Sequence, residues 1–108
     1  MGLVYLLCEI SDSSERYKIG VTRRDVEQRI KEHTTGNSNP IHLVDIYKSD
    51  IYIKIESWLH RKYGSYKTLD GGTEWFDLPG EDVIKFTKTC EEVEGTIRNL
   101  MEHNPFFD

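Results

Sequence analysis

The apolar positions near the start of the chain have the spacing of strands. Residues 3–10 form a nearly continuous apolar run, and in residues 17–22 apolar and polar positions alternate. The polar cluster at residues 11–15 separates them, and a further strand pattern covers residues 42–47. Alternation with period two, bounded by turn residues, is typical of strands. The pattern therefore predicts a β-hairpin and a third strand.

Two stretches between and after these strands have helical spacing. Asp25 can cap a helix whose apolar positions continue up to Gly36. A second stretch from residue 51 to Tyr63 winds its apolar residues around a helix, and Gly64 follows it. We therefore expect two helices, one on each side of the third strand in the sequence.

The last third of the chain predicts a short strand and a long helix. A turn at residues 70–72 precedes the strand candidate at residues 74–78. After Pro79 and a glycine, apolar residues recur at spacings of three and four from Val83 to Leu100. This is about two and a half heptads, fewer than a coiled coil needs. We expect this helix to pack on its own domain, with a homodimer contact through residues 83–100 as the alternative.

The order of these elements predicts an α+β fold. We expect a small, mostly antiparallel three-stranded sheet flanked by helices, formed by residues 1–79. Residues 80–108 would add the C-terminal helix.

Composition places the chain among folded, intracellular proteins. It has 108 residues, 37% hydrophobic and 31% charged, which is the size of one domain. The longest apolar run is far too short to span a membrane, and no charged leader precedes it. Cys8 and Cys90 lie among apolar neighbours without metal-binding spacing, so we expect buried free thiols in a reducing compartment.

Charge is distributed unevenly along the chain. The net charge is −5, with +2 in residues 1–67 and −7 in residues 68–108. This balance argues against a non-specific nucleic-acid binder, which needs a basic face. It leaves room for a local basic site in the first two thirds.

Five side chains in that part have the chemistry that phosphodiester hydrolysis requires. A water must lose a proton, and negative charge that develops on the phosphate oxygens must be stabilised. A strand tyrosine, a strand lysine, and an arginine and a histidine on one helix could meet these needs, with a glutamate on the next helix as a metal ligand. These residues are Tyr5, Lys18, Arg29, His33 and Glu56.

Their order and spacing resemble the GIY-YIG nuclease domain. The resemblance covers the chain from Gly2 to about Leu78 and is closest to a stand-alone branch with lysine in place of the second signature tyrosine. The segments that carry it are LVY (3–5), KIG (18–20), Arg29 with His33, IESWLHRKY around Glu56, and EWFDL.

The resemblance implies a metal-dependent endonuclease that acts on DNA, with RNA as the other nucleic acid to consider. Tyr5 would activate the water, Arg29 would hold the scissile phosphate, and Glu56 would bind Mg²⁺, for which Mn²⁺ can substitute. His33 matches a helix histidine found in some members, and Lys18 stands at the second tyrosine position.

Three further residues are candidates for nucleic-acid contacts. Arg23 and Arg24 lie between the second strand and the first helix, and His60 lies one turn after Glu56. The alternative for His60 is a position next to the metal. Trp75 is expected to pack in the core rather than to stack on bases.

Three other interpretations stay open at this stage. Lys18 could instead pair with Glu9 or Glu15 across the hairpin. The missing second tyrosine also fits a nucleic-acid-binding module that kept a nuclease fold without turnover, and the heptad pattern fits a protein-interaction subunit.

Overall fold

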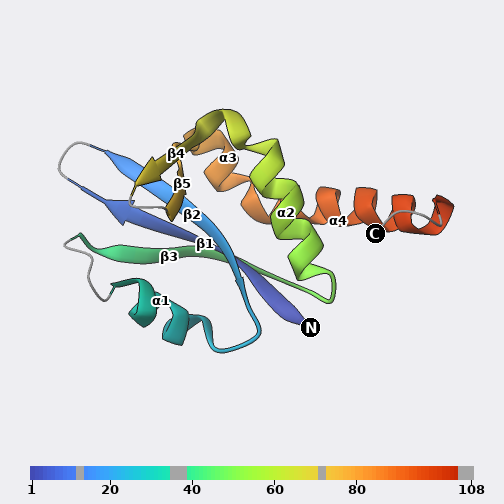
Figure 1. The fold of residues 1–108 in the computed structure, drawn as a ribbon, viewed down its shortest axis with the longest axis horizontal. Coiled ribbons are helices and arrows are strands. Elements are labelled where there is room, and N and C mark those ends of the chain that lie inside the picture. Colours follow the sequence, from blue (N-terminus) through green and yellow to red (C-terminus); the bar gives the residue numbers. More distant parts are fainter. Residues whose placement is uncertain (12–13, 35–38, 71–72, 105–108) are drawn as a thin grey trace.

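The computed structural model describes residues 1–11, 14–34, 39–70 and 73–104 of the chain (Figure 1). A five-stranded sheet and four α-helices make up the described part. The elements in chain order are β1 (Gly2–Ile10), β2 (Glu15–Thr22), α1 (Val26–Thr34), β3 (Ile41–Ser49), α2 (Tyr52–Lys62), the 3₁₀ turn η1 (Gly64–Tyr66), β4 (Lys67–Asp70), β5 (Thr73–Phe76), α3 (Gly80–Ile84) and α4 (Phe86–His103).

The strands form one antiparallel sheet in the order β3-β1-β2-β5-β4. The α+β class and the β1–β2 hairpin are confirmed, but the expectation of three strands is wrong. The sequence predicted a strand near β5 and missed β4, which is a short polar segment without alternation. Pairing with β5 in a hairpin satisfies the backbone of β4, although β4 has no alternating apolar pattern of its own.

Parts of three predicted turns fall outside the described residues. These are the centre of the turn at 11–15, the helix end at Gly36 and the glycine pair of the turn at 70–72. The start of α1 is described: the Asp25 carboxylate accepts a hydrogen bond from the Glu27 amide at 3.0 Å. The prediction of a helix cap at Asp25 is therefore confirmed.

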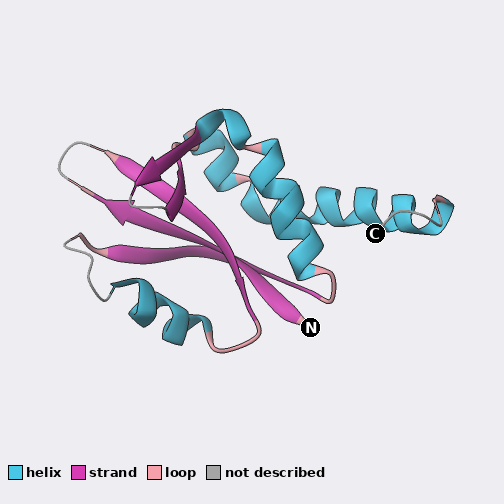
Figure 2. Cartoon of the chain, in the orientation of Figure 1, coloured by secondary structure: helices cyan, strands magenta, loops and turns pink. Residues whose placement is uncertain are grey.

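Helices cover the two faces of the sheet unequally (Figure 2). On one face Leu6 and Ile19 pack against α2 through Ile55 and Leu59, in the main core. On the other face a smaller cluster joins β1 to α1. Its members are Tyr5, Leu7, Ile41 and Trp75, with Val26 and Ile30 packed against them. Trp75 is therefore a packing residue, as predicted.

The C-terminal helix is broken at Lys85 into α3 and α4. The spacing predicted one continuous helix, but α3 ends at Ile84, which is exposed. Beyond it, Phe86, Cys90 and Ile97 are fully buried in the main core, so this apolar stripe packs on the sheet and α2. The homodimer alternative stays a prediction.

Both cysteines are buried free thiols, as predicted. No helix in the described part of the chain has the length and apolar character needed to cross a membrane.

Candidate functional site

The register of the β1–β2 hairpin places Tyr5 and Lys18 on the same face of the sheet. Tyr5 lies opposite Gly20, and Leu7 lies opposite Lys18. Directly opposed residues of an antiparallel pair point to the same side. Tyr17 therefore points to the other face, where its hydroxyl donates a hydrogen bond to Glu15 at 3.0 Å.

Lys18 does not form the cross-strand ion pair with Glu9 that the sequence left as an alternative. Glu9 is buried and pairs with Arg16 at 2.7 Å. Arg16 in turn lies over the Trp75 ring, with its guanidinium carbon 4.3 Å from the ring centre. The Lys18 Nζ lies 5.7 Å from the same centre, on the side toward Tyr5 along β2.

Gly20 allows the tyrosine ring to lie across β2. Tyr5 is 1% exposed, and its hydroxyl occupies the position that a Cβ on residue 20 would take. A glycine inside a strand commonly marks such a close approach. The glycine in the KIG segment is thus part of the site, because it decides where the Tyr5 hydroxyl lies.

Arg29 reaches this hydroxyl from α1. Its neighbours Val26 and Ile30 pack on the sheet, which directs the arginine along the flank of the helix. The guanidinium is hydrogen-bonded to the Tyr5 hydroxyl, and its Nη1 donates to Glu32 at 2.6 Å. The buried Nε of Arg29 finds no acceptor among the described residues.

His60 fastens α2 to the open edge of β2. Strand β5 pairs with β2 only at Tyr17, so the edge of β2 is unpaired beyond that point. His60 Nε2 donates to the Ile19 carbonyl at 2.8 Å, and Nδ1 lies 2.8 Å from the Glu74 carboxylate. Because both partners are acceptors, these two contacts occupy both ring nitrogens of His60.

Glu56 lies one helical turn before His60, on the same flank of α2. Its carboxylate is half-buried and accepts no hydrogen bond within the described part of the chain. Burial raises its pKa, which the positive charges of His60 and Lys18 oppose and the negative charge of Glu74 reinforces. Glu56 is therefore a carboxylate held near Lys18 without an ion-pair partner of its own.

The four central groups lie close enough to change one another's pKa. Burial raises the pKa of Tyr5, and the hydrogen bond from Arg29 counteracts this. Burial lowers the pKa of Lys18, and the nearby charge of Arg29 adds to the effect, while Glu56 opposes it. A tyrosine, two cations and one carboxylate from β1, β2, α1 and α2 thus form one cluster.

The other predicted residues lie around this cluster or outside the described set. His33 belongs to α1, but its side chain lies outside the described residues. Arg23 and Arg24 are exposed between β2 and α1, and Arg24 is 3.3 Å from Glu32. His60 uses both ring nitrogens inside the protein, so a phosphate contact through it would require one of those bonds to break.

Three residues of the cluster were missed in the sequence. Glu32 orients Arg29 and had a sequence signal, because it lies three residues later on the same helix. Gly20 had a weaker one, its place within a strand. Glu74 had none, since its pairing with His60 depends on how β5 lies beside α2.

The residues present fit a single hard cation better than a complete metal cage. In the described part of the chain no three His, Cys, Asp or Glu side chains gather as ligands. Mg²⁺ is commonly bound by one or two carboxylates together with waters and substrate phosphates. The unpaired Glu56 carboxylate has the donor chemistry for that role.

Comparisons with known proteins identify the family of the chain. A family model described as the T5orf172 domain matches residues 2–98. No curated protein and no solved structure matches the chain. The matched range includes the whole sheet, α1, α2 and most of α4.

Proposed function

The chain belongs to the T5orf172 domain family, and from this premise we propose that it is a metal-dependent endonuclease that hydrolyses DNA phosphodiester bonds. Membership in this family is compatible with a nuclease-like or DNA-binding function. The observation that carries the proposal is the convergence of Tyr5, Lys18, Arg29 and Glu56 from four elements. Their arrangement follows the GIY-YIG-like pattern of the sequence.

Arg29 and Lys18 would stabilise the phosphate. Arginine presents a planar set of N–H donors that matches phosphate oxygens, and the Arg29 side chain is 30% exposed. Lys18 adds a second positive charge from β2. Two partly buried cations are worth more against developing negative charge than exposed ones, because water screens them less.

Tyr5 would handle the proton of the attacking water. Its pKa is raised by burial, so the hydroxyl is neutral at neutral pH. The hydrogen bond from Arg29 favours the tyrosinate and lowers the cost of passing a proton through this oxygen. Gly20 and Arg29 hold the oxygen in place and limit its motion.

Glu56 would hold the metal. A bound Mg²⁺ supplies Lewis-acid stabilisation of the phosphate oxygens and of the leaving oxygen. His60 and Glu74 would position Glu56, because their bonds fix α2 against β2 and β5.

A cleavage assay with matched glutamate variants tests the proposal. The substrates are supercoiled plasmid, duplex, flap, four-way junction, single strand and RNA, with Mg²⁺ or Mn²⁺. Wild type and Glu91→Ala, a change at an exposed position of α4, should cleave at the same rate. Glu56→Ala should not cleave, while its circular dichroism stays native. Equal cleavage by Glu56→Ala would overturn the assignment.

A second candidate function is a binding module with the same fold and no turnover. It is favoured by Lys18 at the second signature position, together with Tyr17 pointing to the other face of the sheet. This module would shift nucleic acid in a gel without any metal-dependent product. Cleavage that depends on Glu56 would exclude it.

A further inference from the structure

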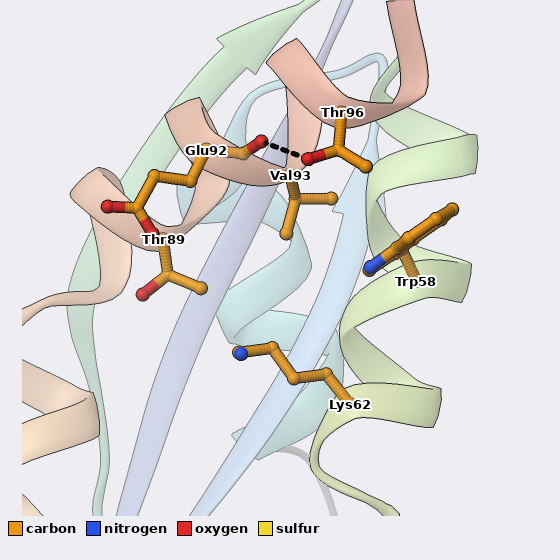
Figure 3. A pocket seen from close by; sticks show the side chains of 6 residues that line it. All are labelled: Trp58, Lys62, Thr89, Glu92, Val93 and Thr96. Atoms are coloured by element: carbon orange, nitrogen blue, oxygen red, sulfur yellow. Dashed lines mark hydrogen bonds between the residues drawn. The ribbon is translucent and has the colours of Figure 1, made fainter. Parts of the chain in front are cut away.

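We infer that the groove between α2 and α4 is a second nucleic-acid site, which binds an unpaired nucleotide of the substrate strand; this rests on the proposed function. The groove has a volume of about 370 Å³ and is lined by both helices (Figure 3). Its lining residues are Trp58, Lys62, Thr89, Glu92, Val93 and Thr96. A second hollow of about 330 Å³ shares Trp58 and Lys62 and adds Arg61.

The groove has the chemistry of a base-stacking site. Trp58 is partly buried and forms one wall, opposite Val93 and Thr96 on α4 (Figure 3). Aromatic side chains on a protein surface bind bases of single strands, because every base offers a ring face. The size lies within the usual range of ligand pockets, which is roughly 300–1,000 Å³. A single base would fit this space.

Two cations beside Trp58 match a phosphate, Lys62 in the groove and Arg61 in the second hollow. Arg61 and Lys62 lie in the last turn of α2, and neither forms an ion pair with a carboxylate in the described part of the chain. The Arg61 guanidinium carbon lies 5.3 Å from the Trp58 ring centre. Figure 3 shows the Glu92 carboxylate pointing away from Trp58, so this acid does not face the stacking wall. In a chain of net charge −5, this is a local positive site beside an aromatic ring.

The position of the groove fits a strand that also reaches the cluster around Glu56. On α2, Trp58 and Lys62 share one flank, whereas Glu56 and His60 share the other, with the buried Ile55 and Leu59 between them. The two sites are thus separated by the width of one helix, about 10 Å. A strand that crosses the exposed face of α2 would reach both sites. The groove would therefore favour substrates with a single-stranded segment next to the scissile bond.

Fluorescence anisotropy of labelled oligonucleotides, without divalent metal, tests the inference independently of cleavage. The probes are a short oligothymidine and a duplex of equal length. Wild type should bind the single strand more tightly than the duplex. Trp58→Leu should weaken single-strand binding by about tenfold, since stacking is worth about 1–3 kcal/mol per base. Trp58→Phe should keep most of the affinity.

A matched pair of variants tests the contribution of positive charge to binding. Lys62→Gln should lower the slope of affinity against salt by about one unit, whereas Lys48→Gln, an exposed change on β3, should leave it unchanged. If Trp58→Leu does not fold, as judged by circular dichroism, the comparison of Lys62→Gln with Lys48→Gln decides instead.

The outcomes separate this inference from the proposed function. If folded Trp58→Leu binds the single strand as tightly as wild type, the assignment of the groove as a nucleic-acid site is overturned, even if Glu56-dependent cleavage is found. Trp58-dependent binding without any cleavage would support the groove while the endonuclease proposal fails. Thymidine monophosphate could also displace the labelled oligonucleotide as effectively as unlabelled oligonucleotide does. That result would indicate a site for free nucleotides and would overturn the assignment to a strand.

Discussion

Tyr5 and Gly20 lie directly opposite each other on β1 and β2, and the tyrosine hydroxyl fills the space that a Cβ on residue 20 would need. This contact places the hydroxyl within reach of Arg29. The absence of a side chain at one position thus sets the geometry of the whole cluster. The first prediction follows directly from this pair.

Gly20→Ala should damage both stability and activity. The added methyl group would push the Tyr5 ring out of place, which we expect to lower the free energy of unfolding by about 1–3 kcal/mol. Cleavage should fall with it, because the hydroxyl moves away from Arg29. Urea denaturation and a plasmid-nicking assay measure the two effects.

Gly95→Ala is the matched control for this change. Gly95 is exposed within α4, and nothing lies within 4 Å of a Cβ built there. An alanine in a helix interior is favoured over glycine by about 0.5–1 kcal/mol, so this variant should be slightly more stable than wild type. A Gly20→Ala protein as stable as Gly95→Ala would contradict the close contact.

Arg29→Lys should reduce cleavage at least tenfold although the charge is kept. Lysine cannot reproduce the planar set of donors that bonds Tyr5 and Glu32. Arg98→Lys, at an exposed position of α4, should change the rate little. Nicking rates at saturating metal measure both variants, and equal rates would remove the special role of Arg29.

The cleavage rate should rise with pH from neutral into the alkaline range. Burial raises the pKa of Tyr5, so the fraction of tyrosinate at neutral pH is small and grows with pH. Tyr5→Phe should lower the rate and remove this rise. A wild-type rate that does not depend on pH over this range would show that the Tyr5 proton is not involved.

Glu74→Gln should lower stability by less than about 1 kcal/mol at neutral pH. The hydrogen bond from His60 is the main cause of the lowered pKa of Glu74, and the side chain is 40% exposed, so screening limits its value. A carboxyl group whose pKa is lowered by folding stabilises the folded protein at pH values above its unfolded pKa of about 4.3. This contribution is lost as the pH falls through the pKa of the folded state.

Urea denaturation at several pH values measures the Glu74 effect. The difference between wild type and Glu74→Gln should disappear at strongly acidic pH. Glu91→Gln, at an exposed position, serves as the control and should match wild type throughout. A Glu74→Gln difference that persists in acid would point to packing rather than charge.

Neither cysteine should react with a thiol reagent in the native protein. Burial raises the pKa of Cys90 to about 12 and also raises the pKa of Cys8, so thiolate is scarce and inaccessible at both positions. Titration with Ellman's reagent should detect two thiols in urea and none under native conditions. Fast reaction of native protein would contradict the buried core around α4.

The sequence by itself determined the α+β class, the first hairpin, the cap of α1 at Asp25 and the candidate residues of the site. These features follow from local patterns, because period-two and helical spacing and capping are properties of neighbouring residues. The family-like order of Tyr5, Lys18, Arg29 and Glu56 could be read in the same way.

Only the tertiary structure decided which of these side chains meet. A one-residue change of hairpin register would have turned Lys18 away from Tyr5, and no local signal fixes that register. The bond between His60 of α2 and Glu74 of β5 also depends on how separate elements pack, whereas the β4–β5 hairpin and the break at Lys85 are local features that the apolar spacing did not reveal. Packing between separate elements placed the side chains of the site, and no short stretch of residues encodes that packing.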